Sequence, residues 1–99
     1  GADAADLAVN RAMGELALTI AAAAKMVVER NLADMPRQLR RIARMANHLG
    51  LSTICATAAD AQSCLEDFDA TAFAAIWARL IRVAGSQLAS GPEAQGRRV

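Results

Sequence analysis

The chain has 99 residues, of which 55% are hydrophobic and 3% aromatic, and its formal net charge at pH 7 is +1. A chain of this length makes one domain and can bury a core without metal ions or disulfide bonds. Abundant alanine, no tyrosine and only two prolines favour helices over a sheet. The charge balance excludes no class of partner, because the basic residues are clustered rather than numerous.

No segment has the pattern of a membrane span. Ala17–Val28 is apolar, but Lys25 interrupts it, and it is shorter than the roughly 20 residues that a span requires. No basic-then-apolar leader opens the sequence, which predicts a cytoplasmic protein. Cys55 and Cys64 are predicted to be buried free thiols, since their spacing fits neither a disulfide on one helix nor a metal site.

Two helical segments are predicted in the first third of the chain, a short leading helix over Asp3–Met13 and a longer one over Glu15–Asn31. Gly14 marks a break between them, although a glycine inside a helix costs only about 1 kcal/mol, so the two segments can also run together. The helical period places an inward stripe on the longer segment, made of Leu16, Ile20, Ala23, Ala24 and Val27.

The next helix begins after Asp34, which is an expected N-cap. Pro36 lies in the first turn, where its missing N–H is tolerated. The helix reaches at least Leu49. Gly50 then either caps its C-terminus or lies inside a helix that continues through Leu51–Ile54.

Two further helices are expected over Cys55–Asp67 and Ala70–Ala89, the second capped by Asp69. Ser90-Gly91-Pro92 is predicted to end the last helix, which assigns residues 1–91 to one domain and 92–99 to a flexible C-terminal tail. The inward positions on these two helices are Ala58, Ala61, Leu65, Phe68, Phe73, Ile76, Trp77, Leu80, Ala84 and Leu88.

Helices of this length joined by short loops favour antiparallel neighbours. The predicted fold is therefore all-α, an up-down antiparallel four-helix bundle preceded by a short N-terminal helix.

The helix that follows Asp34 has two contrasting faces. Its apolar face consists of Leu39, Ile42, Ala46 and Leu49, which we expect to be buried. A basic stripe free of carboxylates lies on another face, and such a stripe suggests an anionic partner. The stripe steps by four, three and four residues, with Arg40 beside it, and consists of Arg37, Arg41, Arg44 and His48.

Most catalytic patterns are absent from the sequence. It has no glycine-rich phosphate loop and no set of His, Cys and carboxylate residues at metal-ligand spacing, so neither a metal nor a cofactor is expected. His48 is the single histidine. It is either a solvated residue near a helix end, where the dipole favours a cation, or a phosphoryl acceptor or partner contact.

The segment from Asp34 to Leu88 resembles the histidine-phosphotransfer (Hpt) domain of bacterial phosphorelays. That family has a helix reading Leu-Arg-Arg-x-Ala-His-x-Leu-Lys-Gly, then a Leu-Glu pair about twenty residues later, then a loop with Asp before the last helix. The matching residues here are Leu39-Arg40-Arg41-Ile42-Ala43, Leu65-Glu66 and Asp69. The resemblance implies a four-helix bundle whose exposed helix exchanges phosphoryl groups with receiver aspartates.

The chain departs from the family at the functional positions. Arg44 occupies the place of the acceptor histidine, Asn47 that of the lysine, and His48 that of the glycine. A guanidinium stays protonated and offers only donors, so Arg44 cannot accept a phosphoryl group. His48 lies one turn, about 6 Å, further along the same face.

These residues favour a module that docks a response-regulator receiver domain or a hybrid sensor kinase, without normal His phosphotransfer. The predicted partner-binding residues are Arg37, Arg40, Arg41, Arg44, Asn47 and His48. Three alternatives remain: phosphotransfer through His48, a basic helical module for nucleic acid, and a bundle that self-associates as a homodimer. The small net charge weighs against nucleic acid.

Overall fold

The computed structural model describes residues 2–96, with side chains from residue 4 to residue 88. Within this range the chain forms four α-helices joined by short turns. Their bounds are Ala2–Val28 for α1, Met35–His48 for α2, Ser52–Glu66 for α3 and Ala70–Gly96 for α4. The predicted all-α class is confirmed.

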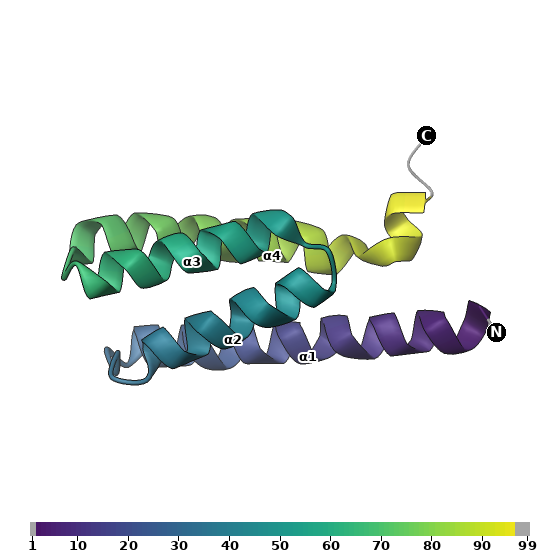
Figure 1. Cartoon of the computed structure of the whole chain (residues 1–99), viewed down its shortest axis with the longest axis horizontal. Coiled ribbons are helices and arrows are strands. Elements are labelled where there is room, and N and C mark those ends of the chain that lie inside the picture. Colours follow the sequence, from purple (N-terminus) through teal and green to yellow (C-terminus); the bar gives the residue numbers. More distant parts are fainter. Residues whose placement is uncertain (1, 97–99) are drawn as a thin grey trace.

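Successive helices run in opposite directions, as Figure 1 shows. Each helix packs against its neighbours in the chain, and α1 also packs against α4, which closes a four-helix bundle. The packing of α3 on α2 and α4 is more extensive than that of α1 on α2 and α4. Because α1 and α4 have 27 residues each while α2 and α3 have 14 and 15, the molecule is elongated, with extents of 46 × 26 × 20 Å.

The core lies between the four helices and is built mainly from aliphatic side chains. The predicted inward residues Leu16, Leu39 and Leu80 are completely buried. The stacked rings of Phe73 and Trp77, with centroids 6.2 Å apart, supply its aromatic part. The other buried apolar residues are Ile20, Ala23, Met35, Ile42, Ala46, Ile54, Ala58, Ala61 and Ala84.

The predicted short N-terminal helix does not exist as a separate element. Gly14 lies inside α1, which runs without interruption from Ala2 to Val28. The flanking residues are mostly good helix formers, and their preference outweighs the small cost of a single glycine. No described helix is long and apolar enough to cross a membrane.

Gly50 caps the C-terminus of α2, which is the first of the two alternatives predicted from the sequence. It has a φ of +73°, and the N–H of Gly50 donates to the Asn47 carbonyl while the N–H of Leu51 donates to the Ala46 carbonyl. This is a Schellman motif, in which a left-handed residue satisfies the last carbonyls of a helix. The next helix starts at Ser52, earlier than the predicted Cys55.

Phe68 is the clearest error of the sequence-based core. It was expected to point inward, but its side chain is 95% exposed. The cause is that α3 ends at Glu66, and Phe68 takes the left-handed position of a second Schellman motif with a φ of +55°. The following Asp69 caps α4 as predicted, because its Oδ1 accepts a hydrogen bond of 3.0 Å from the Ala72 N–H.

Phe68→Gly is expected to stabilise the protein by about 0.5–1 kcal/mol. A left-handed conformation costs a side-chain-bearing residue roughly 1–2 kcal/mol, whereas glycine adopts it freely. The exposed ring contributes little burial in return. Urea denaturation measures the change in the free energy of unfolding. Arg30→Gly is the matched control, because Arg30 holds the equivalent left-handed position in the Schellman motif that follows α1, with a φ of +58°. A loss of stability in Phe68→Gly would mean that the ring packs in solution.

The predicted end of the last helix at Ala89 is wrong, because α4 continues to Gly96. A proline such as Pro92 removes one backbone hydrogen bond and kinks a helix, but it need not end it. Figure 1 shows the ribbon of α4 bending in its last turns. The predicted tail, residues 92–99, thus begins within α4, and residues 97–99 lie outside the described range.

Candidate partner-binding face

The basic face of α2 forms because its apolar and basic residues segregate at the helical period. The expected burial of Ile42 and Ala46 is confirmed, and both are completely buried, whereas Leu49 is only half-buried. All six predicted partner-binding residues are exposed on the opposite side of the helix. We call this surface the basic face; it consists of Arg37, Arg40, Arg41, Arg44, Asn47 and His48.

Only one arginine of the basic face is neutralised within the described chain. Arg37 Nε lies 3.0 Å from Asp34 Oδ1. Arg40, Arg41 and Arg44 make no ion pair with any described residue. These guanidinium groups are therefore free to bind an anionic surface, and each carries five donors.

Asp34 holds the expected position before α2 but does not cap it with its side chain. Its backbone has a φ of −98° and a ψ of 0°, away from the extended conformation of most N-caps. The carboxylate instead accepts a 3.0 Å hydrogen bond from Gln38 Nε2 and pairs with Arg37. These two interactions hold the pKa of the Asp34 carboxyl below its usual value, and the hydrogen bond from Gln38 has the larger effect.

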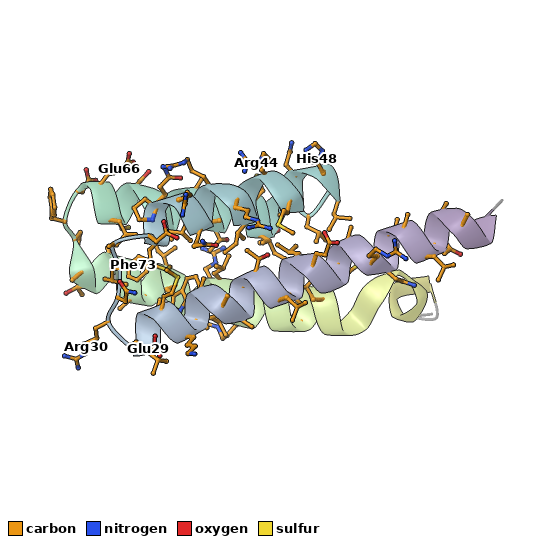
Figure 2. All side chains as sticks on the ribbon, turned by 90° about the horizontal axis from the view of Figure 1, so that it is seen from below. Glu29, Arg30, Arg44, His48, Glu66 and Phe73 are labelled. Atoms are coloured by element: carbon orange, nitrogen blue, oxygen red, sulfur yellow. The ribbon has the colours of Figure 1, made fainter. Side chains whose placement is uncertain are left out.

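The histidine lies at the C-terminal end of the basic face. His48 is the last residue of α2, where the helix dipole favours a cation. Figure 2 shows Arg44 and His48 side by side along the outer edge of α2, both pointing away from α1. The imidazole of His48 is thus exposed, one helical turn from Arg44.

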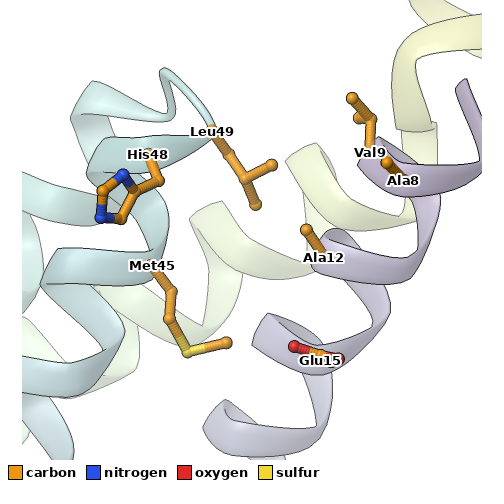
Figure 3. A pocket seen from close by; sticks show the side chains of 7 residues that line it. All are labelled: Ala8, Val9, Ala12, Glu15, Met45, His48 and Leu49. Carbon is orange, nitrogen blue, oxygen red and sulfur yellow. The ribbon is translucent and has the colours of Figure 1, made fainter. Parts of the chain in front are cut away.

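A shallow depression borders His48 between α2 and α1. It has a volume of about 350 Å³, and Met45 of α2 and Leu49 just after α2 meet Ala12 and Glu15 of α1 there. Figure 3 shows Met45 and Leu49 reaching towards α1, whereas the His48 ring lies on the outer side of α2. Glu15 carries the carboxylate of this depression, and no sequence motif links it to His48 because the two residues are far apart in the chain.

The helix that packs on the other side of α2 from α1 carries acidic but no basic residues. α3, which packs closely on α2, has no lysine or arginine but carries Asp60 and Glu66. Asp67 and Asp69 follow in the next turn. In Figure 2, Glu66 lies on the same edge of the molecule as Arg44 and His48, at the other end. The dense positive charge of α2 therefore does not continue onto α3.

The remaining reactive groups do not assemble into a site. Cys55 and Cys64 are free thiols, as predicted, but both are half-buried rather than buried. Partial burial and then the charges of Asp69, Asp67 and Asp60 raise the pKa of the Cys64 thiol, which lowers its reactivity at neutral pH. Among the described residues, no group of three or more His, Cys, Asp or Glu side chains is placed to hold a metal ion.

In comparisons with known proteins, no family model, curated protein or solved structure matches the chain.

Proposed function

We propose that this protein is an Hpt-like signalling module that docks a response-regulator receiver domain, or the receiver of a hybrid sensor kinase, through the basic face of α2. The observation that carries the proposal is the set of exposed guanidinium groups of Arg40, Arg41 and Arg44, which have no ion-pair partner among the described residues. The phosphorylation pocket of a receiver is acidic, so charge complementarity favours this contact.

The same residues argue against normal phosphotransfer. In the aligned register, Arg44 stands where the Hpt family has its acceptor imidazole. Guanidinium has no free lone pair to attack a phosphoryl group at neutral pH, but it binds carboxylates in a bidentate manner. The proposed role is therefore occupation of the receiver's acidic pocket without removal of its phosphoryl group.

Phosphotransfer through His48 is the alternative that a specific observation supports. Its imidazole is exposed on the same face as Arg44 and on the outer side of α2, where a docked receiver would approach it (Figures 2 and 3). Nucleic-acid binding is less favoured, because the formal net charge of the chain is only +1 and the helix packed on α2 carries no lysine or arginine.

Transfer of labelled phosphate distinguishes the two signalling roles. Receiver domains encoded in the same genome are phosphorylated with labelled acetyl phosphate and mixed with the wild-type protein or with His48→Gln. We expect a receiver to bind both proteins, because His48→Gln leaves the arginines of the basic face in place, and we expect no acid-labile label to appear on either protein. Label that appears on the wild type and disappears in His48→Gln would contradict the proposal and establish a working phosphotransfer protein.

A further inference from the structure

The long first helix has apolar residues on two opposite faces. Its inner face carries Leu16, Ile20 and Ala23 and is buried in the core. Its outer face repeats the same alternation of four and three residues, which is the spacing of a helix–helix seam. We call this surface the outer seam. Every one of its residues is exposed: Leu7, Arg11, Gly14, Leu18, Ala21, Lys25 and Val28.

The outer seam exposes more apolar surface than a solvated helix face requires. Leu7, Leu18 and Val28 are 67%, 73% and 81% exposed. Large apolar side chains repeated along one face of a helix are typical of a contact with a second helix.

Four charged residues on or beside this face are self-complementary; Glu15 lies at its edge, next to the depression between α1 and α2. Arg11, Glu15, Lys25 and Glu29 are all exposed and alternate in sign along the helix. Although Arg11–Glu15 and Lys25–Glu29 have the i, i+4 spacing of intrahelical pairs, neither pair forms an ion pair in the structure. These charges are available to a partner.

Of the two symmetric ways to pair two such helices, only the antiparallel one pairs these charges favourably. Parallel helices in register would place each charge against its own copy. In an antiparallel pair crossing at the level of residue 20, Arg11 faces Glu29 of the second copy and Glu15 faces Lys25 of the second copy. Two-fold symmetry repeats each contact, as in other isologous interfaces.

We propose that α1 forms the interface of a two-fold symmetric homodimer in which the outer seams of two copies pack antiparallel. Leu18 lies near the centre of this contact. Gly14, Ala21 and Ala22 have little or no side chain, so the helix backbones can approach closely there. At Gly14 an added Cβ would meet no atom within 4 Å, so the space above it is open to a second helix.

This interface is independent of the receiver-docking proposal. In Figure 2, Arg44 and His48 point away from α1, so a dimer built on α1 leaves the basic face accessible. Each dimer would present two basic faces, and failure of either proposal leaves the other standing.

Charge reversal provides a test that loss of folding cannot mimic. One variant, Arg11→Glu with Lys25→Glu, makes the seam charges all acidic, and the other, Glu15→Lys with Glu29→Lys, makes them all basic. Sedimentation equilibrium should show a dimeric wild type and at least about tenfold weaker self-association for each variant alone. An equimolar mixture of the two variants should again form dimers, because the opposite charges then face each other.

Arg79→Glu on α4 is the control for charge reversal, since Arg79 is exposed and belongs neither to the outer seam nor to the four charges that would pair across it. It should remain dimeric. Circular dichroism should show equal helix content for all four proteins. A wild type that stays monomeric at high micromolar concentration would overturn the proposal. So would a dimer that survives both reversals, or variants that fail to associate when mixed.

Discussion

Trp77→Ala is expected to lower the free energy of unfolding by about 3–5 kcal/mol, the range of large-to-alanine substitutions in cores. Trp77 is the largest side chain of α4 and is only 7% exposed. Its ring stacks on Phe73 at an interplanar angle of 14°, so the substitution removes apolar burial and an aromatic contact together. A domain of this size is stable by about 5–15 kcal/mol, so the variant would keep little margin.

Urea denaturation monitored by circular dichroism measures this loss. Arg79→Ala is the control, because Arg79 is on the same helix but exposed, and it should change the free energy of unfolding by less than about 0.5 kcal/mol. If the Trp77→Ala curve coincided with that of the control, Trp77 would have to be exposed in solution, and its assignment to the core would be wrong.

The combined substitution Arg40→Glu, Arg41→Glu and Arg44→Glu is expected to weaken binding of a receiver domain by at least roughly 100-fold. Each change replaces an attraction to the acidic pocket with a repulsion. All three residues are exposed, so the fold should be unaffected. Isothermal titration calorimetry with a receiver that binds the wild type measures the change. Wild-type affinity should fall as salt is added.

Arg79→Glu combined with Arg82→Glu is the control for charge alone, since both residues are exposed on α4. This protein should bind the receiver within about threefold of the wild type. If the two sets of substitutions weakened binding equally, the interaction would depend on overall charge, and the basic face would not be the docking surface.

The basic face could be predicted from sequence because arginine and isoleucine differ strongly in their cost of burial. Once Ile42 was assigned to the core, the helical period required Arg40, Arg41 and Arg44 to be exposed. The same contrast located Leu39 and Trp77 correctly in the core.

Other features depended on the backbone, and the pattern of side chains did not reveal them. Phe68 looked like an inward residue only while α3 was assumed to continue past Glu66. The left-handed turn there redirects its side chain into solvent. Gly14 looked like a break, but one glycine is a weak signal in an alanine-rich helix.

The outer seam of α1 was hidden for a different reason. Alanine and glycine occur as readily in cores as on surfaces, so Ala21 and Gly14 do not indicate which face of a helix is covered. The residue type of Leu18 is compatible with either the buried or the exposed face of the helix. The outer seam can be distinguished from the buried stripe of Leu16 and Ile20 only by the exposed fraction of each side chain in the folded bundle.

The most direct test of the docking account is a titration of the isotope-labelled protein with an unphosphorylated receiver domain, followed through backbone amide signals. The account predicts that the largest shifts fall between Arg37 and His48 on α2, with those of α1 and α4 nearly unchanged. Shifts centred on α1 or on the α3–α4 turn around Phe68, or no shift with any receiver domain encoded in the same genome, would contradict it.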